Sequence, residues 1–256
     1  MSQNLRIDLS ERFPHLKRAP ITEAVIEIRA KASSKLEEPQ MLELLKPALG
    51  DYPEHRGTHA FEGHLQFLPG KQPEVSAKTL GLLGVQFTSS DKKQIAKFQN
   101  DLFSFSRLHP YHGWDDFSKE AVRLWKVHLE LARPLEIQRI GVRFINAFPV
   151  SQEREVTDYF VGFPDDLPDL NITLGGFLHR TVFIVPEHPY EMTMIKTMKE
   201  PKKGEKPLFI LDIDVYSNRT FQIDDKALID RLSEMRWLKN KSFFGSISKH
   251  LLKQFS

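Results

Sequence analysis

The sequence predicts an α+β protein of two pseudo-symmetric halves, each ordered strand, helix, antiparallel strands, helix, with helices covering one face of the sheet. Two observations predict this fold. Short runs alternate apolar and polar residues, as half-buried strands do, and longer runs repeat apolar residues at helical spacing. The same order of runs occurs twice, which indicates an internal duplication. We expect intimately joined halves at residues 1–134 and 135–256, with strands that can form one continuous sheet.

The first half begins, after a polar lead, with an alternating strand over residues 21–30. A helix is predicted over residues 39–49, and strand-like runs follow it. The polar stretch at residues 89–93 is typical of a hairpin turn. An amphipathic helix over residues 114–128 closes this half, with acidic residues in its first turn. The strand-like runs are residues 64–68, 82–88, 94–99 and 102–108.

The second half repeats this order. It opens with a strand over residues 137–148, followed by one or two helical turns over residues 156–163. Asp224 is predicted to cap a helix that carries Leu228, Leu232 and Met235, and Ser242 to cap a last helix. The strands between are residues 176–185, 191–198 and 208–216.

Charged residues recur at matching positions in the first strands of the two halves. Without gaps, Glu23 aligns with Arg139, and Glu27 aligns with Arg143. If the two strands pair antiparallel about a pseudo-twofold axis, Glu23 lies near Arg143 and Glu27 near Arg139. Such pairs stabilise a sheet by roughly 0.2–1 kcal/mol each. Gly141 leaves space beside both guanidinium groups, so a small anion site stays open as an alternative.

Asp212 and Asp214 are the pair that most resembles a reaction site. The alternation in LFILDIDVY places both carboxylates on the polar face of a strand. Two carboxylates can hold Mg²⁺ through oxygen ligands, as at many phosphoryl-transfer sites. No third acidic ligand stands at a fixed spacing. We therefore favour a polar sheet face on which these carboxylates pair with nearby arginines. The predicted polar face comprises Glu23, Glu27, Arg139, Arg143, Asp212 and Asp214.

Several common chemistries leave no trace in the sequence. The chain contains no cysteine, which excludes disulfides, thiolate nucleophiles and cysteine-bound metals. Phosphate-binding glycine loops, the H-E-x-x-H zinc motif and the G-x-S-x-G nucleophile elbow are all missing. His55, His59 and His64 are interspersed with glycines, and we interpret this stretch as a solvated loop rather than a metal site. The sequence therefore predicts no cofactor and no bound metal.

Basic residues are balanced by acidic ones, and the net charge is +2. The densest basic cluster contains Lys202, Lys203 and Lys206, and a hairpin tip explains it more simply than a binding site. With Arg180 it is the weak candidate for nucleic-acid binding. The mixed charge of the polar face argues against a general DNA-binding saddle. No apolar run is long enough to span a bilayer and no signal peptide is visible, so we expect a cytoplasmic protein without a membrane partner.

Four segments in order resemble the signatures of a family of sporadically distributed prokaryotic proteins of about this length with no assigned activity. They are LKRAPITEAVIEI, FSFSRLHPYHGWDDFSKEAVRLW, IQRIGVRFIN and WLKNKSFFGSISKHLL. The resemblance covers nearly the whole chain. Patchy distribution fits horizontally moved cargo, including phage defence or toxin–antitoxin modules. The repeated element order also resembles the half-unit of a TATA-box-binding-protein-like saddle.

Three functions remain open from the sequence. We favour a non-catalytic binding or accessory protein that engages a partner protein or a second copy of itself, because no strong catalytic motif is present. A nucleic-acid or nucleotide-binding protein is the alternative, based on the saddle-like order and the arginines. A metal-dependent phosphoryl-transfer enzyme, using Asp212 and Asp214 with Glu23 or Glu27, is the third.

Overall fold

The computed structural model describes residues 5–66, 74–149, 159–161, 176–199 and 208–255. The helices are α1 (Glu38–Ala48), α2 (Trp114–Ala132), α3 (Asp225–Ser246) and α4 (Lys249–Lys253). A small two-stranded sheet joins β6 (Glu136–Ile137) to β11 (Phe221–Gln222). The remaining strands form one large sheet and are β1 (Ile21–Arg29), β2 (Glu54–Gln66), β3 (Glu74–Thr88), β4 (Gln94–Gln99), β5 (Leu102–Leu108), β7 (Arg139–Pro149), β8 (Leu178–Ile184), β9 (Glu191–Lys199) and β10 (Leu208–Ser217).

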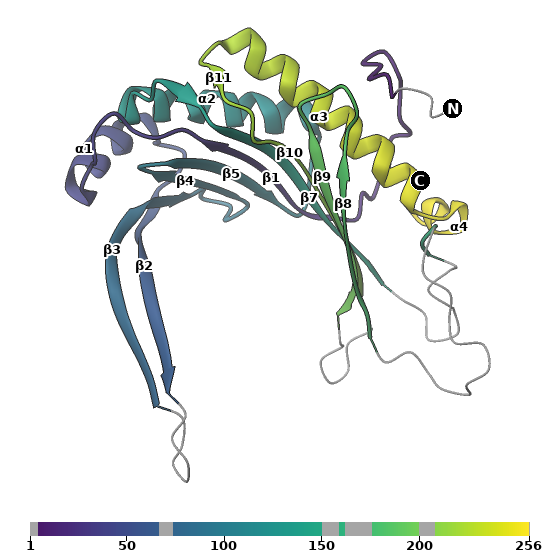
Figure 1. The fold of residues 1–256 in the computed structure, drawn as a ribbon, viewed down its shortest axis with the longest axis horizontal. Helices are drawn as coiled ribbons and strands as arrows, with labels where there is room; N and C mark the ends of the chain where they lie inside the picture. The colour runs from purple at the N-terminus through teal and green to yellow at the C-terminus, as the bar shows by residue number, and fades with distance from the viewer. Residues whose placement is uncertain (1–4, 67–73, 150–158, 162–175, 200–207, 256) are drawn as a thin grey trace.

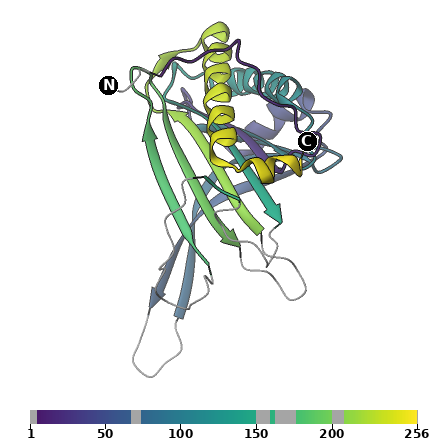
Figure 2. The ribbon, with the colours of Figure 1, turned by 90° about the vertical axis from the view of Figure 1, so that its right-hand side faces the viewer.

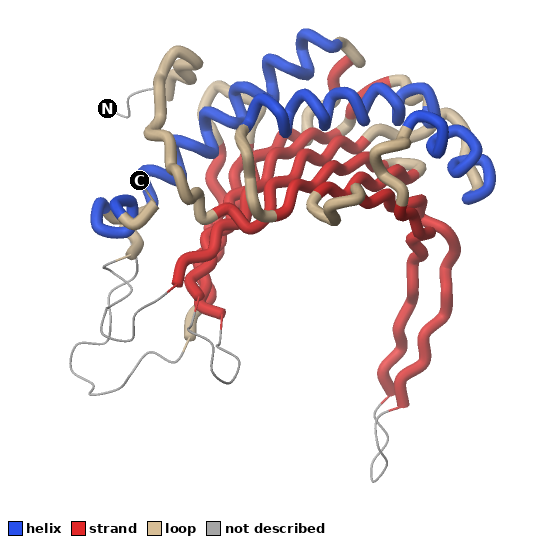
Figure 3. The backbone as a smooth tube through the Cα atoms, turned by 180° about the vertical axis from the view of Figure 1, so that it is seen from behind, coloured by secondary structure: helices blue, strands red, loops and turns tan. Residues whose placement is uncertain are grey.

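The large sheet has nine strands in the order β2-β3-β4-β5-β1-β7-β10-β9-β8. Every pairing within it is antiparallel. The sheet arches, and the described helices lie on its convex side, while the β2–β3 hairpin extends from one flank (Figure 1, Figure 3). The mixed α+β class predicted from the sequence is confirmed.

Strands β1 and β7 lie side by side at the middle of the sheet. In their antiparallel register, Val25 lies opposite Arg143 and Glu27 lies opposite Gly141. Successive side chains of a strand point to opposite faces. The apolar residues Ala24 and Ile26 are therefore buried under the helices, and the charged residues of β1 and β7 lie on the concave face.

The core lies between the sheet and the helices. Helix α2 packs on β5, and α3 packs on β7 and β10. Aromatic rings fill this layer, as in the stacked pair of Phe105 and Phe117, whose ring centres are 5.5 Å apart. Burying such a side chain contributes roughly 1.5–3 kcal/mol, so this single layer supplies most of the driving force for folding. Figure 2 shows α3, in yellow, lying along the strands of the second half.

The β2–β3 hairpin is longer than the sequence predicts. Strand β2 begins at Glu54 rather than at residue 64, and β3 begins at Glu74 rather than at residue 82. The histidine-containing stretch is therefore strand, and its interpretation as a solvated loop is wrong. The pairing shifts register near Thr58 and again near Ala60, and glycines are tolerated at such bulges. These shifts break the alternation by which a strand is recognised.

The C-terminal helices also differ from the prediction. Asp224 caps α3 as expected, with its Oδ1 accepting a 2.7 Å hydrogen bond from the backbone N–H of Ala227. Ser242 does not start a new helix, because α3 continues to Ser246 and the Ser242 hydroxyl contacts the Met192 sulfur. Helix α4 is capped instead by Ser248.

The remaining expectations have mixed outcomes. The predicted strand over residues 137–148 is divided between β6 and β7. The helical turns expected over residues 156–163 fall mostly outside the described residues. The described part, residues 159–161, is not helical, because Phe160 forms a β-bridge with Ile247. Within the described parts of the chain, no helix has the length and apolar character needed to cross a membrane.

His128 is a polar side chain in the aromatic core. Its ring is 0% exposed and lies 5.4 Å from Trp125 and 5.8 Å from Phe103, measured between ring centres. Neither ring nitrogen has a hydrogen-bond partner among the described residues. Burial lowers the pKa of His128 from 6.5 to about 4, since a charged imidazolium is costly in this environment.

We predict that His128→Leu raises the free energy of unfolding at pH 7 by about 1–3 kcal/mol, because the unsatisfied polar group is removed. In the wild type, the unfolded chain binds a proton below pH 6.5 that the folded chain takes up only near pH 4. The free energy of unfolding of the wild type is therefore at its full value above pH 6.5. It decreases as the pH falls from 6.5 through 4, by roughly 3 kcal/mol in total. Urea unfolding between pH 7 and pH 4 measures this, and a variant with the same pH dependence as the wild type would contradict it.

Candidate functional site

The polar residues predicted for the sheet face do meet on its concave side, where they form ion pairs. Arg139 of β7 donates from one terminal nitrogen to Glu27 Oε1 at 2.7 Å and from the other to Asp214 Oδ2 at 3.3 Å. Its guanidinium also lies 4.9 Å from the centre of the Tyr216 ring. Gly141 makes room for this arrangement, because a Cβ there would lie 3.0 Å from an Arg139 nitrogen. Arg139 is thus held by side chains of both strands that flank β7, namely β1 and β10.

The second arginine of β7 pairs with a different carboxylate. Arg143 binds Asp212 through its Nε at 2.9 Å and through a terminal nitrogen at 2.5 Å. The Asp212 side chain is 9% exposed, whereas that of Arg143 is 47% exposed. The hydrogen bonds that Arg143 donates to Asp212 raise the pKa of this arginine above its usual value. One side of this guanidinium remains accessible to a ligand or partner.

The two ion pairs predicted between the first strands have different outcomes. Glu27 and Arg139 form the expected ion pair. Glu23 lies opposite Ile145, close enough to Arg143 for its charge to help raise the pKa of that arginine. Arg143 nevertheless bonds Asp212 of β10, which takes the place that we assigned to Glu23. A comparison of the two first strands could not reveal a partner from a third strand.

Asp212 and Asp214 are both engaged by arginines and do not form an open metal site. Burial raises the pKa of Asp214 above its usual value, although Arg139 and Arg143 oppose this effect. Across the described residues, no cluster of three or more acidic or histidine side chains has the geometry to hold a metal ion. These carboxylates therefore form ion pairs between neighbouring strands of the sheet.

The weak nucleic-acid candidates do not form a patch in the described structure. Arg180 lies on the edge strand β8, opposite Ile195 of β9, which places it on the concave face. Lys202, Lys203 and Lys206 lie outside the described residues. Near Arg180 the surface is apolar rather than basic, since Leu178 and Ile184 of the same strand are 73% and 78% exposed.

Strand β8 therefore presents an apolar edge. It is the last strand on its side of the sheet. Its register with β9 places Leu178, Val182 and Ile184 on the same concave face as Arg180, and all three are exposed. An edge strand also has unpaired backbone N–H and C=O groups, which can bind another strand. Apolar side chains and free backbone groups coincide here.

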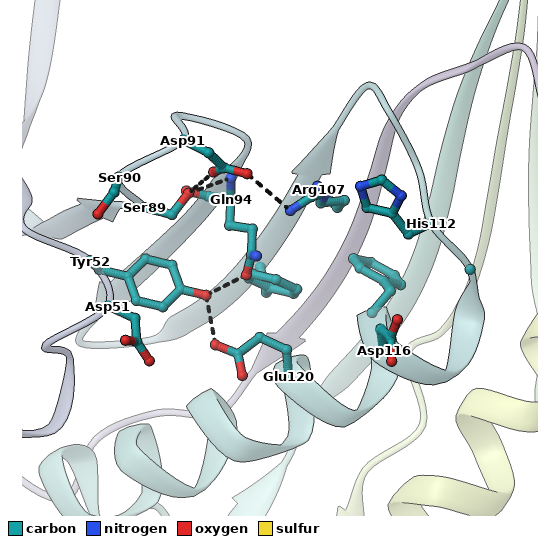
Figure 4. Close-up of a pocket in the computed structure, with 13 residues that line it drawn as sticks. Asp51, Tyr52, Ser89, Ser90, Asp91, Gln94, Arg107, His112, Asp116 and Glu120 are labelled. Carbon is teal, nitrogen blue, oxygen red and sulfur yellow. Dashed lines mark hydrogen bonds and ion pairs between the residues drawn. The ribbon is translucent and has the colours of Figure 1, made fainter.

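A pocket of about 540 Å³ opens on the helical side, between α2, the β3–β4 turn and β5 (Figure 4). The Tyr52 hydroxyl lies 2.7 Å from Glu120 Oε1 and 2.8 Å from Gln94 Oε1. A phenol has one hydrogen to donate, and the carboxylate is the stronger acceptor. Burial, followed by the contact with Glu120, raises the pKa of Tyr52. The central polar groups of this pocket thus satisfy one another.

The rim of this pocket is mainly acidic. Asp91 accepts hydrogen bonds from the Ser89 hydroxyl at 2.6 Å and from the Lys93 backbone N–H at 2.9 Å, and these bonds lower its pKa. Asp51 and Asp116 also line the pocket. Such a rim suits a cationic or neutral ligand better than a phosphate, which carries negative charge. No sequence pattern predicts this pocket, because its residues come from four separated segments.

No protein-family model matches this chain, and no curated protein matches it in sequence.

We predict that the Arg139–Glu27 pair can be exchanged. Arg139→Glu should lower the free energy of unfolding by more than about 1 kcal/mol, since it places like charges beside Glu27 and Asp214. Adding Glu27→Lys should restore part of this loss but not all, because Asp214 still faces the new carboxylate. Urea unfolding of both single variants and of the double variant measures the coupling.

Arg143 provides the matched comparison. Arg143→Glu should be rescued by Asp212→Lys and not by Glu23→Lys, because only Asp212 bonds this arginine. Rescue by Glu23→Lys instead would indicate that Glu23, and not Asp212, is the partner of Arg143.

Proposed function

We propose that this is a non-catalytic binding protein that holds a partner protein along the concave face of its sheet and at the β8 edge. The observation that carries the proposal is the exposed apolar edge of β8, where Leu178 and Ile184 are more than two-thirds accessible, at 73% and 78%. A partner can add a strand to such an edge, with main-chain hydrogen bonds giving affinity and the alternate side chains giving specificity. The protein acts in the cytoplasm in this proposal, and phage defence or toxin neutralisation is a natural context.

The charge pattern of the concave face supports a protein partner over a nucleic acid. Acidic and basic side chains alternate across it, and the central ones are paired with each other. A surface that grips a phosphate backbone needs an excess of free positive charge. Mixed and matched charges instead favour specificity for a partner surface that carries both signs. Nucleic-acid or nucleotide binding is the second candidate, supported by the half-exposed Arg143 and by Arg180.

The phosphoryl-transfer alternative has less support. A magnesium site needs carboxylate oxygens that are free to coordinate the ion. Asp212 accepts three hydrogen bonds from Arg143, and Asp214 accepts one from Arg139. Binding of Mg²⁺ would have to displace these guanidinium groups, which leaves both arginines without their carboxylate partners.

We also propose that the two halves, residues 1–134 and 135–256, arose by duplication. The strand order supports this, because β1 and β7 open the halves and lie together at the centre. The strands that precede the long helices, β5 and β10, flank this central pair on either side. The same arrangement supports a TATA-box-binding-protein-like saddle as the architecture. The halves depart from symmetry in their ion pairs, because Arg139 bonds Glu27 whereas Arg143 bonds Asp212 rather than Glu23.

We predict that the affinity-tagged wild-type protein co-purifies with a partner from its native cells. The double variant Leu178→Lys/Ile184→Lys should retain at least about tenfold less of this partner. Charge at both positions should cost more than about 1.4 kcal/mol of binding free energy. Ile229→Lys is the matched control, because Ile229 is an apolar residue of α3 that is 49% exposed and lies away from β8. Quantitative mass spectrometry of the three samples gives the comparison, and sedimentation shows whether the partner is a second copy.

The opposite outcome is equally clear. A protein that remains monomeric, and whose captured proteins are the same in all three variants, has no partner at this edge. Saturable binding to oligonucleotides that weakens steeply with salt would favour the second candidate.

A further inference from the structure

A second cavity, of about 500 Å³, lies on the helical side of the sheet, away from the concave face. It is enclosed by the N-terminal lead, the loop before α2, the end of β7 and the middle of α3. Its volume is in the range of pockets that hold small molecules, about 300–1,000 Å³. Aromatic side chains form one part of its walls, among them Phe13, Tyr111, Trp114 and Phe243. The cavity can therefore pack against an apolar body.

The polar groups of this cavity are concentrated on α3. Lys239 lines it and is only 9% exposed. The Lys239 ammonium lies 3.9 Å from the centre of the Phe144 ring and donates one hydrogen bond, to Asn240 Oδ1 at 2.5 Å. An ammonium has three hydrogens to donate, so this one is incompletely bonded. Among the described residues it has no carboxylate partner within ion-pair distance.

A second cation shares this face of the helix. Arg236 precedes Lys239 by one helical turn and also lines the cavity. Its nearest carboxylate is Asp115 at 3.9 Å, and the Asp115 side chain is 96% exposed, so this pair is weak. The single acidic residue of the lining, Glu11, is engaged by the Trp237 indole at 2.9 Å and by Lys241 at 2.6 Å. Arg12 of the N-terminal lead is a third basic residue of the lining, so the cavity has three basic side chains and no free anion among the described residues.

A buried amine without a counter-charge is unfavourable for the fold. Burial and, to a smaller extent, the nearby Arg236 together lower the pKa of Lys239 from 10.5 to about 7. A methionine or leucine would fill the same helical position without this penalty. The cavity therefore contains a buried donor that its own side chains do not fully satisfy.

We propose that this cavity is a binding site for a small organic anion, a carboxylate with an aromatic or alkyl body, whose charged end pairs with Lys239 and Arg236. The apolar body then lies against Trp114, Phe13 and Phe243. The anion supplies the counter-charge that the chain lacks, and the aromatic walls exclude water from the pair. This site is independent of the β8 edge and of the function proposed for it.

The test uses the full-length protein and 3-phenylpropionate, 4-phenylbutyrate and indole-3-propionate as probes, with 3-phenylpropanamide as the uncharged counterpart. Calorimetry should show saturable binding of at least one carboxylate at pH 6 and binding at least about tenfold weaker for the amide. The anion selects the protonated amine, so the affinity should fall about tenfold between pH 6 and pH 8. Quenching of tryptophan fluorescence provides an independent signal, because Trp114 and Trp237 line the cavity.

Lys239→Met should fold, keep the shape of the cavity and lose both the preference for the carboxylate and its pH dependence. Lys226→Met, the same substitution at an exposed site on α3, is the matched control and should bind as the wild type does. Arg12, His15 and His112 also line the cavity, and histidine can change charge in this pH range. His15→Gln and His112→Gln are therefore measured as well, and both should retain the pH dependence.

Three results would overturn the proposal. The first is that no carboxylate probe shows saturable binding up to about 10 mM, because weaker affinity is below that of a functional pocket. The second is equal binding of 3-phenylpropanamide. The third is unchanged carboxylate binding by Lys239→Met. None of these results bears on the partner capture by β8, so the two proposals fail separately.

Discussion

The antiparallel pairing of β1 with β7 is the contact on which the rest of the sheet depends. Four strands lie beyond β1 and three lie beyond β7. The pairing of β1 with β7 is therefore the one that joins these two parts of the sheet. A slip of one residue would turn Ile26 and Val142 outward and bring charged residues under the helices. The apolar alternation therefore determines which face is buried. Registers that differ by an even number of residues bury the same face, and the ion pairs help to select one of them.

The choice among those registers explains the ion pairs at the centre of the concave face. A displacement of two residues preserves the buried face, so burial alone does not decide between the observed register and one in which Glu27 lies directly opposite Arg139. In the observed register Glu27 lies opposite Gly141, and the missing side chain of this glycine leaves room for Arg139 to reach across. Arg139 then bridges β1 to β10, while Arg143 binds Asp212. The concave face has a neutralised centre and an apolar edge at β8, which is a division suited to recognition rather than to chemistry.

Much of this fold follows from local patterns, and the exceptions share a physical cause. The first strand, the amphipathic α2 and the Asp224 cap depend on neighbours in sequence, so the sequence predicts them. The β2 strand was missed because its bulges interrupt the alternation. The partner of Arg143 was missed because it comes from β10, which no comparison of β1 with β7 can include. Tertiary context, not propensity, decides each of these.

The two polar residues within the buried helical stripes illustrate the limit of sequence reasoning. His128 follows Leu124 and Ala121 on α2, and Lys239 follows Met235 and Leu232 on α3, so both stand where a core residue is expected. Their sequence signals are the same. His128 is enclosed by the rings of Phe98, Phe103 and Trp125, which leave no room for a partner, whereas Lys239 lines a cavity. An unsatisfied polar group in a closed core only destabilises the fold, but beside a cavity it can be satisfied by a ligand, and only the packing distinguishes the two.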